Sequence, residues 1–264
     1  MKKVEKIISV GILGILMIFI GNIGRSEIVE TSGIPENKKI EWGIKRGKNN
    51  EQPDLGEYNR KTLEKFDGFA LGNSESKKIY LTFDEGYEAG YTENILQTLD
   101  ECNVKATFFL TAHYVNTQEE LIEKMIQKGH TIGNHTVNHK SMPKLTLEEM
   151  QKEIMDLHIV VKEKFNYEMK YFRPPMGEYS HQSLEKTKQI GYTTVMWSFA
   201  YLDFDENKQP SIEEAKAKIL ENLHSGEIIL LHGNSTTNKE ILKDIINEIK
   251  SKGYTFCSLD QFER

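Results

Sequence analysis

Beyond Lys78 the chain alternates short apolar or aromatic segments with amphipathic ones, and this alternation constrains the fold more than any other feature. Segments typical of β-strands occur at residues 78–83, 105–110, 130–134, 170–173, 193–197, 227–231 and 254–259. A helical pattern links each segment to the next. Strand–helix–strand repetition favours parallel pairing with right-handed crossovers, so we expect an α/β fold with either an open doubly wound sheet or a closed barrel.

The starts of three helices are predicted from capping boxes, in which a Ser or Thr and a Glu three residues later satisfy each other's backbone N–H groups. The longest helical pattern covers residues 147–165, with an apolar stripe that indicates a core-facing helix. The three boxes are Thr117–Glu120, Thr146–Glu149 and Ser211–Glu214.

The N-terminus has the pattern of an export segment. Three lysines, Lys2, Lys3 and Lys6, precede a 17-residue apolar run that starts at Ile7. No A-x-A cleavage triplet follows, so a cleaved signal peptide and a retained membrane anchor both stay open for residues 1–25. The polar residues 26–40 are predicted to be a linker, and residues 41–264 the folded part of the chain, which is long enough for one large domain or two small ones.

Composition narrows the function. The 264 residues are 38% hydrophobic and 28% charged, which is enough apolar content for a substantial core. The net charge is −6, and it becomes −9 without residues 1–25. An acidic domain argues against nucleic-acid binding. Cys102 and Cys257 either form a disulfide outside the cytoplasm or remain two buried thiols, and without a C-x-x-C motif no thiolate zinc site is expected.

Polar residues follow several of the predicted strands, where parallel α/β folds place their chemistry. Asp84 and Glu85 directly follow the first strand, and His135 and His139 follow the third. Two histidines four residues apart face the same direction on a helical turn and can reach one metal ion. No glycine-rich phosphate loop follows any strand, which argues against nucleotide binding.

The later strands add an arginine, an aspartate and a histidine. Arg173 ends the fourth strand, ahead of two prolines that stiffen the backbone. Asp203 follows the fifth strand and His232 the sixth, where a histidine beside a carboxylate is a candidate acid or base. Carboxylate, paired histidines, arginine and a further histidine on one rim together predict a metal-assisted hydrolase of amides or esters.

These residues stand in motifs that resemble the polysaccharide deacetylases of the NodB-homology type, carbohydrate esterase family 4. The segments LTFDEGYEAGYT, MKYFRPPMG, WSFAYLD and YTFCSLD are similar to those of the sporulation muramic-acid deacetylases, which prepare the δ-lactam of spore cortex peptidoglycan. The resemblance runs from about Trp42 to the C-terminus. It implies a distorted seven-stranded (β/α) barrel and removal of acetyl groups from an N-acetylated sugar.

The resemblance also implies roles for individual residues. Asp84 matches the catalytic base, and Arg173 the residue that holds it. His135 and His139 match ligands of one divalent metal ion. Zinc is the expected ion, and cobalt, manganese and nickel stay open. His232 matches the general acid, and Asp203 the residue that keeps it protonated. The residues expected at the substrate are Leu230 in the acetyl pocket, the aromatic Phe204, and Pro175, Met176 and Gly177, a stretch in which one backbone N–H would meet the oxyanion.

Three positions depart from the family pattern. Glu85 stands where most members have an aspartate ligand and the muramic subgroup an asparagine, so we keep it as a candidate ligand. Phe204 replaces the usual tryptophan and loses its indole N–H. Met176 stands where the subgroup often has arginine, a residue expected to meet the lactyl carboxylate of muramic acid.

The expected function is therefore N-deacetylation of peptidoglycan glycan strands, on muramic acid residues during spore-cortex formation. The alternatives are deacetylation of N-acetylglucosamine in peptidoglycan or chitin-like chains, O-deacetylation by the same site, and glycan binding without catalysis. We expect an exported monomer at the outer face of the cytoplasmic membrane, in the cell-wall space or in the spore envelope. Its contact with the membrane would be made only through the N-terminal segment.

Overall fold

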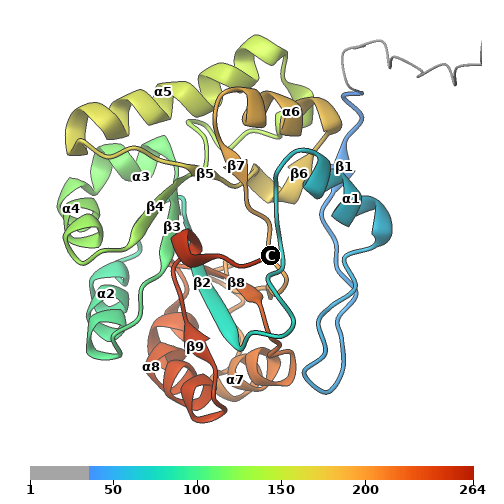
Figure 1. Cartoon of the computed structure of the whole chain (residues 1–264). Coiled ribbons are helices and arrows are strands. Elements are labelled where there is room, and N and C mark those ends of the chain that lie inside the picture. The colour runs from blue at the N-terminus through green and yellow to red at the C-terminus, as the bar shows by residue number, and fades with distance from the viewer. Residues whose placement is uncertain (1–35) are drawn as a thin grey trace, which may run out of the picture. The chain divides into compact units, whose positions relative to one another are not determined.

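The computed structural model describes residues 36–264, in which a curled parallel sheet is surrounded by helices (Figure 1). All seven predicted strands are present, and the sheet runs in the order β7-β5-β4-β3-β2-β8, with β9 paired to the start of β2. Every pairing is parallel. The strands are β2 (Lys78–Glu85), β3 (Thr107–Leu110), β4 (Thr131–Asn134), β5 (Tyr171–Phe172), β7 (Thr193–Thr194), β8 (Glu227–His232) and β9 (Thr255–Phe256).

The two ends of the sheet meet through the segment that follows β7. Phe199 forms a parallel bridge with Ile229 of β8, and the Ser198 N–H donates to the Ile228 carbonyl at 3.1 Å. The segment therefore leaves the β7 edge and joins the β8 edge. The fold is the distorted (β/α)7 barrel rather than an open doubly wound sheet.

Helices connect the strands on the outside of the sheet (Figure 1). The longest, α5, has the predicted bounds, and capping boxes at Thr146 and Ser211 are confirmed. The box at Thr117 is wrong, because Thr117 is the last residue of α3 and its hydroxyl donates to the His113 carbonyl. The helices are α1 (Glu57–Lys65), α2 (Thr92–Glu101), α3 (Ala112–Thr117), α4 (Glu119–Gln127), α5 (Leu147–Phe165), α6 (His181–Gln189), α7 (Ile212–Glu221) and α8 (Thr236–Ser251).

A second, antiparallel sheet pairs β1 (Ile40–Glu41) with β6 (Glu178–Tyr179), and the sequence did not predict it. Just before it, the Asn37 amide donates to the Pro143 carbonyl and accepts from the Ser180 hydroxyl. The folded unit therefore includes residues 37–40, which were assigned to the linker. The predicted export segment, residues 1–25, lies outside the described residues. Within residues 36–264 no helix is both long and apolar enough to cross a bilayer.

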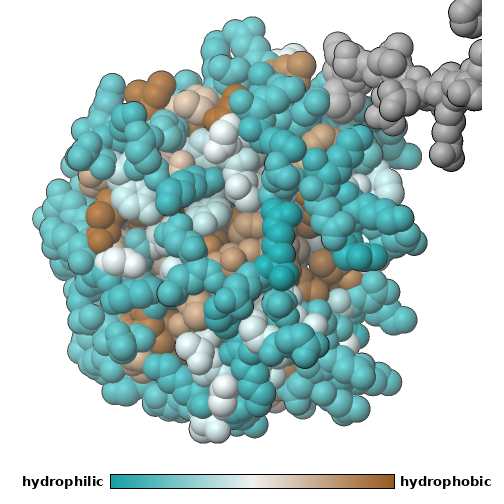
Figure 2. Space-filling view, viewed as in Figure 1, coloured by the Kyte–Doolittle hydropathy of each residue, from teal (hydrophilic) through white to brown (hydrophobic). Residues whose placement is uncertain are grey.

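The main core fills the space between the sheet and its helices. Phe83 and Phe108 stack there with ring centroids 5.2 Å apart, and Leu157 of α5 and Ile246 of α8 are fully buried. Hydrophilic residues cover most of the surface seen in Figure 2, with hydrophobic residues in small patches between them. Cys102 and Cys257 are both buried free thiols, so the disulfide alternative is not formed.

Candidate active site

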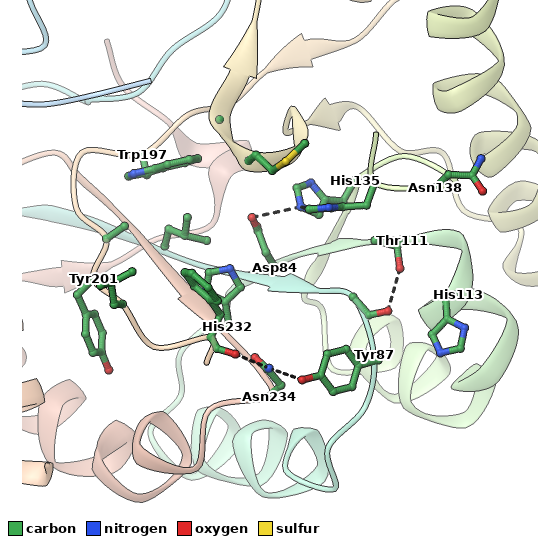
Figure 3. A pocket seen from close by; sticks show the side chains of 18 of the residues that line it. Asp84, Tyr87, Thr111, His113, His135, Asn138, Trp197, Tyr201, His232 and Asn234 are labelled. Carbon is green, nitrogen blue, oxygen red and sulfur yellow. Dashed lines mark hydrogen bonds and ion pairs between the residues drawn. The ribbon is translucent and has the colours of Figure 1, made fainter. Parts of the chain in front are cut away.

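A cavity of about 1100 Å³ opens at the carboxyl ends of the strands (Figure 3). Asp84 reaches it from β2, His135 from the turn after β4 and His232 from the end of β8. Asp84 and His232 are directly paired in the β2–β8 register, so the sheet itself sets them side by side. Eight of the predicted site residues line the cavity: Asp84, His135, His139, Met176, Gly177, Phe204, Leu230 and His232.

Asp84 is held from behind by Arg173. The guanidinium is fully buried, and its Nη1 atom donates to Asp84 Oδ1 at 2.7 Å and to Thr82 Oγ1 at 2.9 Å. Its Nε atom donates to the Val195 carbonyl at 3.2 Å, which fixes its orientation. Burial alone would raise the pKa of Asp84, but the positive charge of Arg173 outweighs it and keeps the pKa below the usual value. Asp84 is therefore a carboxylate at neutral pH.

His135 and His139 lie with their Nε2 atoms 3.2 Å apart. They sit on an irregular turn rather than the predicted helical one, because Thr136 and His139 have left-handed φ values of 72° and 53°. The Nδ1 atom of His135 lies 2.9 Å from the Arg173 carbonyl, which makes Nδ1 the protonated nitrogen and leaves the Nε2 lone pair facing the pocket. Burial lowers the pKa of His135 to about 4 and also lowers that of His139.

The turn that carries the two histidines, residues 135–139 (the histidine turn), is hydrogen-bonded to Glu153 of α5. Glu153 is buried, and it was not identified from the sequence. Its carboxylate accepts the backbone N–H of Asn138 at 2.8 Å and the side-chain amide of Asn138 at 2.7 Å. Its backbone carbonyl accepts the Val137 N–H at 3.0 Å. Three hydrogen bonds from one helical residue thus fix the loop between the two histidines.

The geometry of the two histidines fits a shared divalent metal ion. Two imidazole nitrogens bound to one tetrahedral ion at the usual bond length lie about 3.3 Å apart. The observed separation is 3.2 Å, and both rings are neutral. Asp84 Oδ2 is 3.5 Å from His135 Nε2, so a carboxylate borders the same space. Within residues 36–264 no cluster of three or more His, Cys, Asp or Glu ligands is formed, so the fit rests on the histidine pair.

Glu85, the remaining candidate ligand, does not line the cavity. Strand β2 stays regular through Glu85, which pairs with Leu110, so Asp84 and Glu85 point to opposite faces of the sheet. The Glu85 carboxylate packs against Gly233, where an added Cβ would lie 2.0 Å from Oε1. Burial, with smaller contributions from Glu88 and Asp84, raises the pKa of Glu85 well above its ordinary value. In this structure the Glu85 carboxylate therefore does not reach the histidine pair, and its role as a ligand stays a prediction.

His232 lies on the opposite side of Asp84 from His135 (Figure 3), and it is paired with Asp203. Its Nδ1 atom lies 2.7 Å from Asp203 Oδ1, and its backbone N–H donates to Asp203 Oδ2 at 2.9 Å. Burial lowers the pKa of His232, but the hydrogen bond and charge of Asp203 outweigh it, so the pKa is raised. Asp203 is itself buried and does not line the cavity.

The turn after Arg173 presents backbone and a methionine to the cavity. Met176 and Gly177 line the cavity, whereas Pro175 is buried beneath them and does not. Gly177 has a φ of 66°, and a Cβ there would lie 2.8 Å from the Trp197 ring, so only glycine fits. Met176 is 56% exposed and Phe204 52% exposed, and the Phe204 ring lies 5.4 Å from that of His232.

Other cavity residues were not predicted. Trp197 and Tyr201 are drawn on one wall and Asn138 and His113 on the other (Figure 3). Trp197 is the last residue of a predicted strand, and this position at a strand end could have identified it as a cavity residue. Arg46 comes from the segment before α1 and Lys218 from α7, where no local pattern marks them. The cavity residues missed are Arg46, Gly86, Tyr87, Thr111, His113, Val137, Asn138, Trp197, Ala200, Tyr201, Leu202, Lys218 and Asn234.

Comparison with known proteins assigns this site to a family. The chain is 42% identical over 225 residues to the peptidoglycan-N-acetylmuramic acid deacetylase PdaA of Bacillus subtilis, across 85% of this chain and 86% of PdaA. Residues 71–195 match the family described as polysaccharide deacetylase. The chain belongs to the polysaccharide deacetylase family.

Solved structures place this polysaccharide deacetylase among the family 4 carbohydrate esterases. The structure of Bacillus subtilis PdaA, a family 4 carbohydrate esterase, superposes with a TM-score of 0.84 at 41% identity, covering 86% of this chain and 97% of that one. A peptidoglycan-N-acetylglucosamine deacetylase of Bacillus cereus is 32% identical over 194 residues, covering 72% of this chain and 90% of that protein. Deacetylases of this family are generally metal-dependent.

Proposed function

We propose that this polysaccharide deacetylase removes N-acetyl groups from N-acetylmuramic acid residues of peptidoglycan and releases acetate. The observation that carries the proposal is the placement of Asp84 between a histidine pair and the His232–Asp203 pair, in a cavity open to a glycan. The 42% identity to a peptidoglycan-N-acetylmuramic acid deacetylase supports this choice of sugar.

Asp84 is the proposed general base. Arg173 keeps it ionised, and its second oxygen, Oδ2, is turned toward His135. From there Asp84 takes a proton from the hydrolytic water as the water oxygen bonds to the acetyl carbonyl carbon. Arg173 acts through Asp84 and is a positioning residue, because it lies behind the cavity wall.

His232 is the proposed general acid. The tetrahedral species collapses when the C–N bond breaks, and the leaving amine nitrogen must then receive a proton. His232 supplies it, and Asp203 favours the protonated imidazolium before transfer. The products are acetate and the free amine of the sugar.

His135 and His139 are the proposed ligands of the divalent metal. When bound, the ion supplies Lewis-acid polarisation of the acetyl carbonyl and lowers the pKa of the hydrolytic water. A backbone N–H stabilises the developing oxyanion. In the turn after Arg173, Pro175 has no N–H and that of Gly177 donates to the Pro174 carbonyl, so Met176 provides this donor. Zinc is the metal that we propose, since two imidazoles suit it.

The remaining substrate contacts follow from the cavity walls. Leu230 and the exposed Phe204 line the cavity, and we propose that Leu230 meets the acetyl methyl group and that Phe204 is an aromatic wall for a sugar ring. We propose that residues 1–25 direct export, so that the domain meets peptidoglycan outside the cytoplasmic membrane as a monomer. Formation of the spore cortex is the proposed setting.

A second candidate function is deacetylation of N-acetylglucosamine. The neutral Met176 in the cavity favours it, because its side chain provides no charge for a muramic lactyl group. Relatives that are named peptidoglycan-N-acetylglucosamine deacetylases match over 70% or more of this chain.

Mass spectrometry of peptide-stripped peptidoglycan treated with the protein tests both candidates. We expect acetyl loss on muramic acid, sensitive to a chelator and reduced by Asp84→Asn about 10²-fold to 10⁴-fold. Acetyl loss on glucosamine alone would select the second candidate. No acetyl loss with any divalent metal, together with retained glycan binding, would identify a non-catalytic glycan-binding protein.

A further inference from the structure

The candidate active-site cavity is more positively charged than the chain around it. Among the described residues that line it, Asp84 is the only carboxylate, and Arg173 neutralises it. Arg46 and Lys218, whose side chains are both cationic, line the same cavity. Residues 26–264 carry a net charge of −9, so the charge of the residues that line the cavity is opposite in sign to that of the chain as a whole. A cavity of this kind attracts an anionic ligand.

The Arg46 guanidinium is held by a backbone carbonyl and an aromatic ring, not by a carboxylate. Its Nη2 atom donates to the Ala200 carbonyl at 3.0 Å, and its central carbon lies 5.5 Å from the centroid of the Phe199 ring. Neither Arg46 nor Lys218 forms an ion pair with a carboxylate of residues 36–264. Since guanidinium carries five N–H donors, most of them remain for a ligand.

The position of Arg46 relative to the reacting groups follows from the strand register. Phe199 bridges to Ile229, which is three residues before His232 on β8. Three strand residues span about 10 Å. Arg46 lines the cavity and donates to the carbonyl of Ala200, which lies between Trp197 and Tyr201 in the chain, so we place it on their wall, within the reach of a glycan whose acetyl group lies at Asp84.

We propose that Arg46 binds the lactyl carboxylate of an N-acetylmuramic acid residue and so selects muramic glycan over uncharged glycan. This inference rests on the proposed deacetylase function. The lactyl ether is the acidic substituent of a peptide-stripped glycan strand, and N-acetylglucosamine lacks it. Met176 supplies no charge, whereas Arg46 offers the planar N–H pairs that suit a carboxylate.

Kinetics on two forms of the same glycan test the proposal. Peptide-stripped strands are used with their lactyl carboxylates free or converted to amides, and kcat and KM are measured for each form. We expect the unaltered protein to prefer the free form about fivefold to tenfold in kcat/KM, mainly through KM. Arg46→Gln reduces the preference to less than twofold, and Arg46→Lys restores part of it. Lys45→Gln is the matched control, because it removes a neighbouring exposed charge that does not line the cavity.

Binding separates this inference from the proposed function. The two forms are titrated calorimetrically into each variant in the presence of chelator. A preference for the free form that Arg46→Gln abolishes supports the inference, even if no acetate is released and the deacetylase function fails. Acetate release with equal preference in the unaltered protein and Arg46→Gln overturns the inference and leaves the function intact. Absence of both binding and acetate release overturns both.

Discussion

The buried Arg173 guanidinium donates to Asp84 Oδ1 at 2.7 Å, so the group proposed as the base is paired with a fully buried counter-ion that is fixed in position. The other oxygen of Asp84 is turned to the cavity, 3.5 Å from His135 Nε2. The Asp84 carboxylate thus contacts a buried arginine with one oxygen and the cavity with the other.

Arg173→Gln should destabilise the fold because it leaves the Asp84 carboxylate buried without its partner. We expect the free energy of unfolding in urea to fall by about 3–5 kcal/mol. The double variant Asp84→Asn/Arg173→Gln, which has neither charge, should lose clearly less. Equal losses in the single and double variants would show that the pairing has no such role.

Asp203→Asn should lower the pH above which activity is lost. Activity requires protonated His232 and falls as pH rises through its folded-state pKa, which Asp203 raises. Without that charge the alkaline limb of kcat/KM should move about 1–3 pH units lower. The measurement is a pH profile of kcat/KM. An unmoved limb, with only a uniform loss of rate, would assign the limb to another group.

Glu153→Gln should weaken metal binding although Glu153 is not a proposed ligand. Each carboxylate oxygen of Glu153 accepts one N–H of Asn138. In glutamine one of these oxygens is replaced by an NH₂ group, which is itself a donor, so one of the two hydrogen bonds is lost and the histidine turn is held less firmly. We expect metal affinity to fall about tenfold to a hundredfold in competition with a chromogenic chelator.

The control for Glu153→Gln is Glu148→Gln on the same helix, where the carboxylate is exposed and, among residues 36–264, pairs only with Lys152. This control should keep the affinity of the unaltered protein. Equal affinity in Glu153→Gln and Glu148→Gln would mean that the turn holds its shape without Glu153.

Glu85→Gln should leave metal affinity within about twofold of the original, since the Glu85 side chain faces away from the histidine pair. His135→Ala should abolish most of the affinity in the same titration. A large loss in Glu85→Gln would return Glu85 to the ligand set and require β2 to end one residue earlier than it does.

The sequence predicted the strands well because each is a short apolar segment bounded by polar residues. Their order in space, and the closure through Phe199 and Ile229, depended on contacts between distant segments. The β1–β6 pair involves two residues a side, which is too short to produce a pattern. The capping box predicted at Thr117 was wrong because Thr117 ends α3 and α4 starts only two residues later, so the same residue pattern fits both.

Some residues of the cavity could likewise be predicted from the sequence, and others could not. Asp84, His135 and His232 follow strands, so the topology brings them together, and a motif marks each. The face of the sheet to which the Glu85 side chain points depends on where β2 ends, and the sequence FDEG does not show this. Arg46 and Lys218 lie outside every motif, and only the folded chain brings them to the cavity.

Trp42 ties the start of the folded unit to two walls of the cavity. Its indole N–H donates to the Trp197 carbonyl at 3.0 Å, and its backbone N–H donates to the Gly177 carbonyl at 2.9 Å. The family match begins only at residue 71, yet a chain shortened to that point would keep every recognisable motif while losing this brace and Arg46. A protein that starts at residue 71 would therefore lack part of the cavity wall, and the choice of first residue in a recombinant version decides whether its pocket is whole.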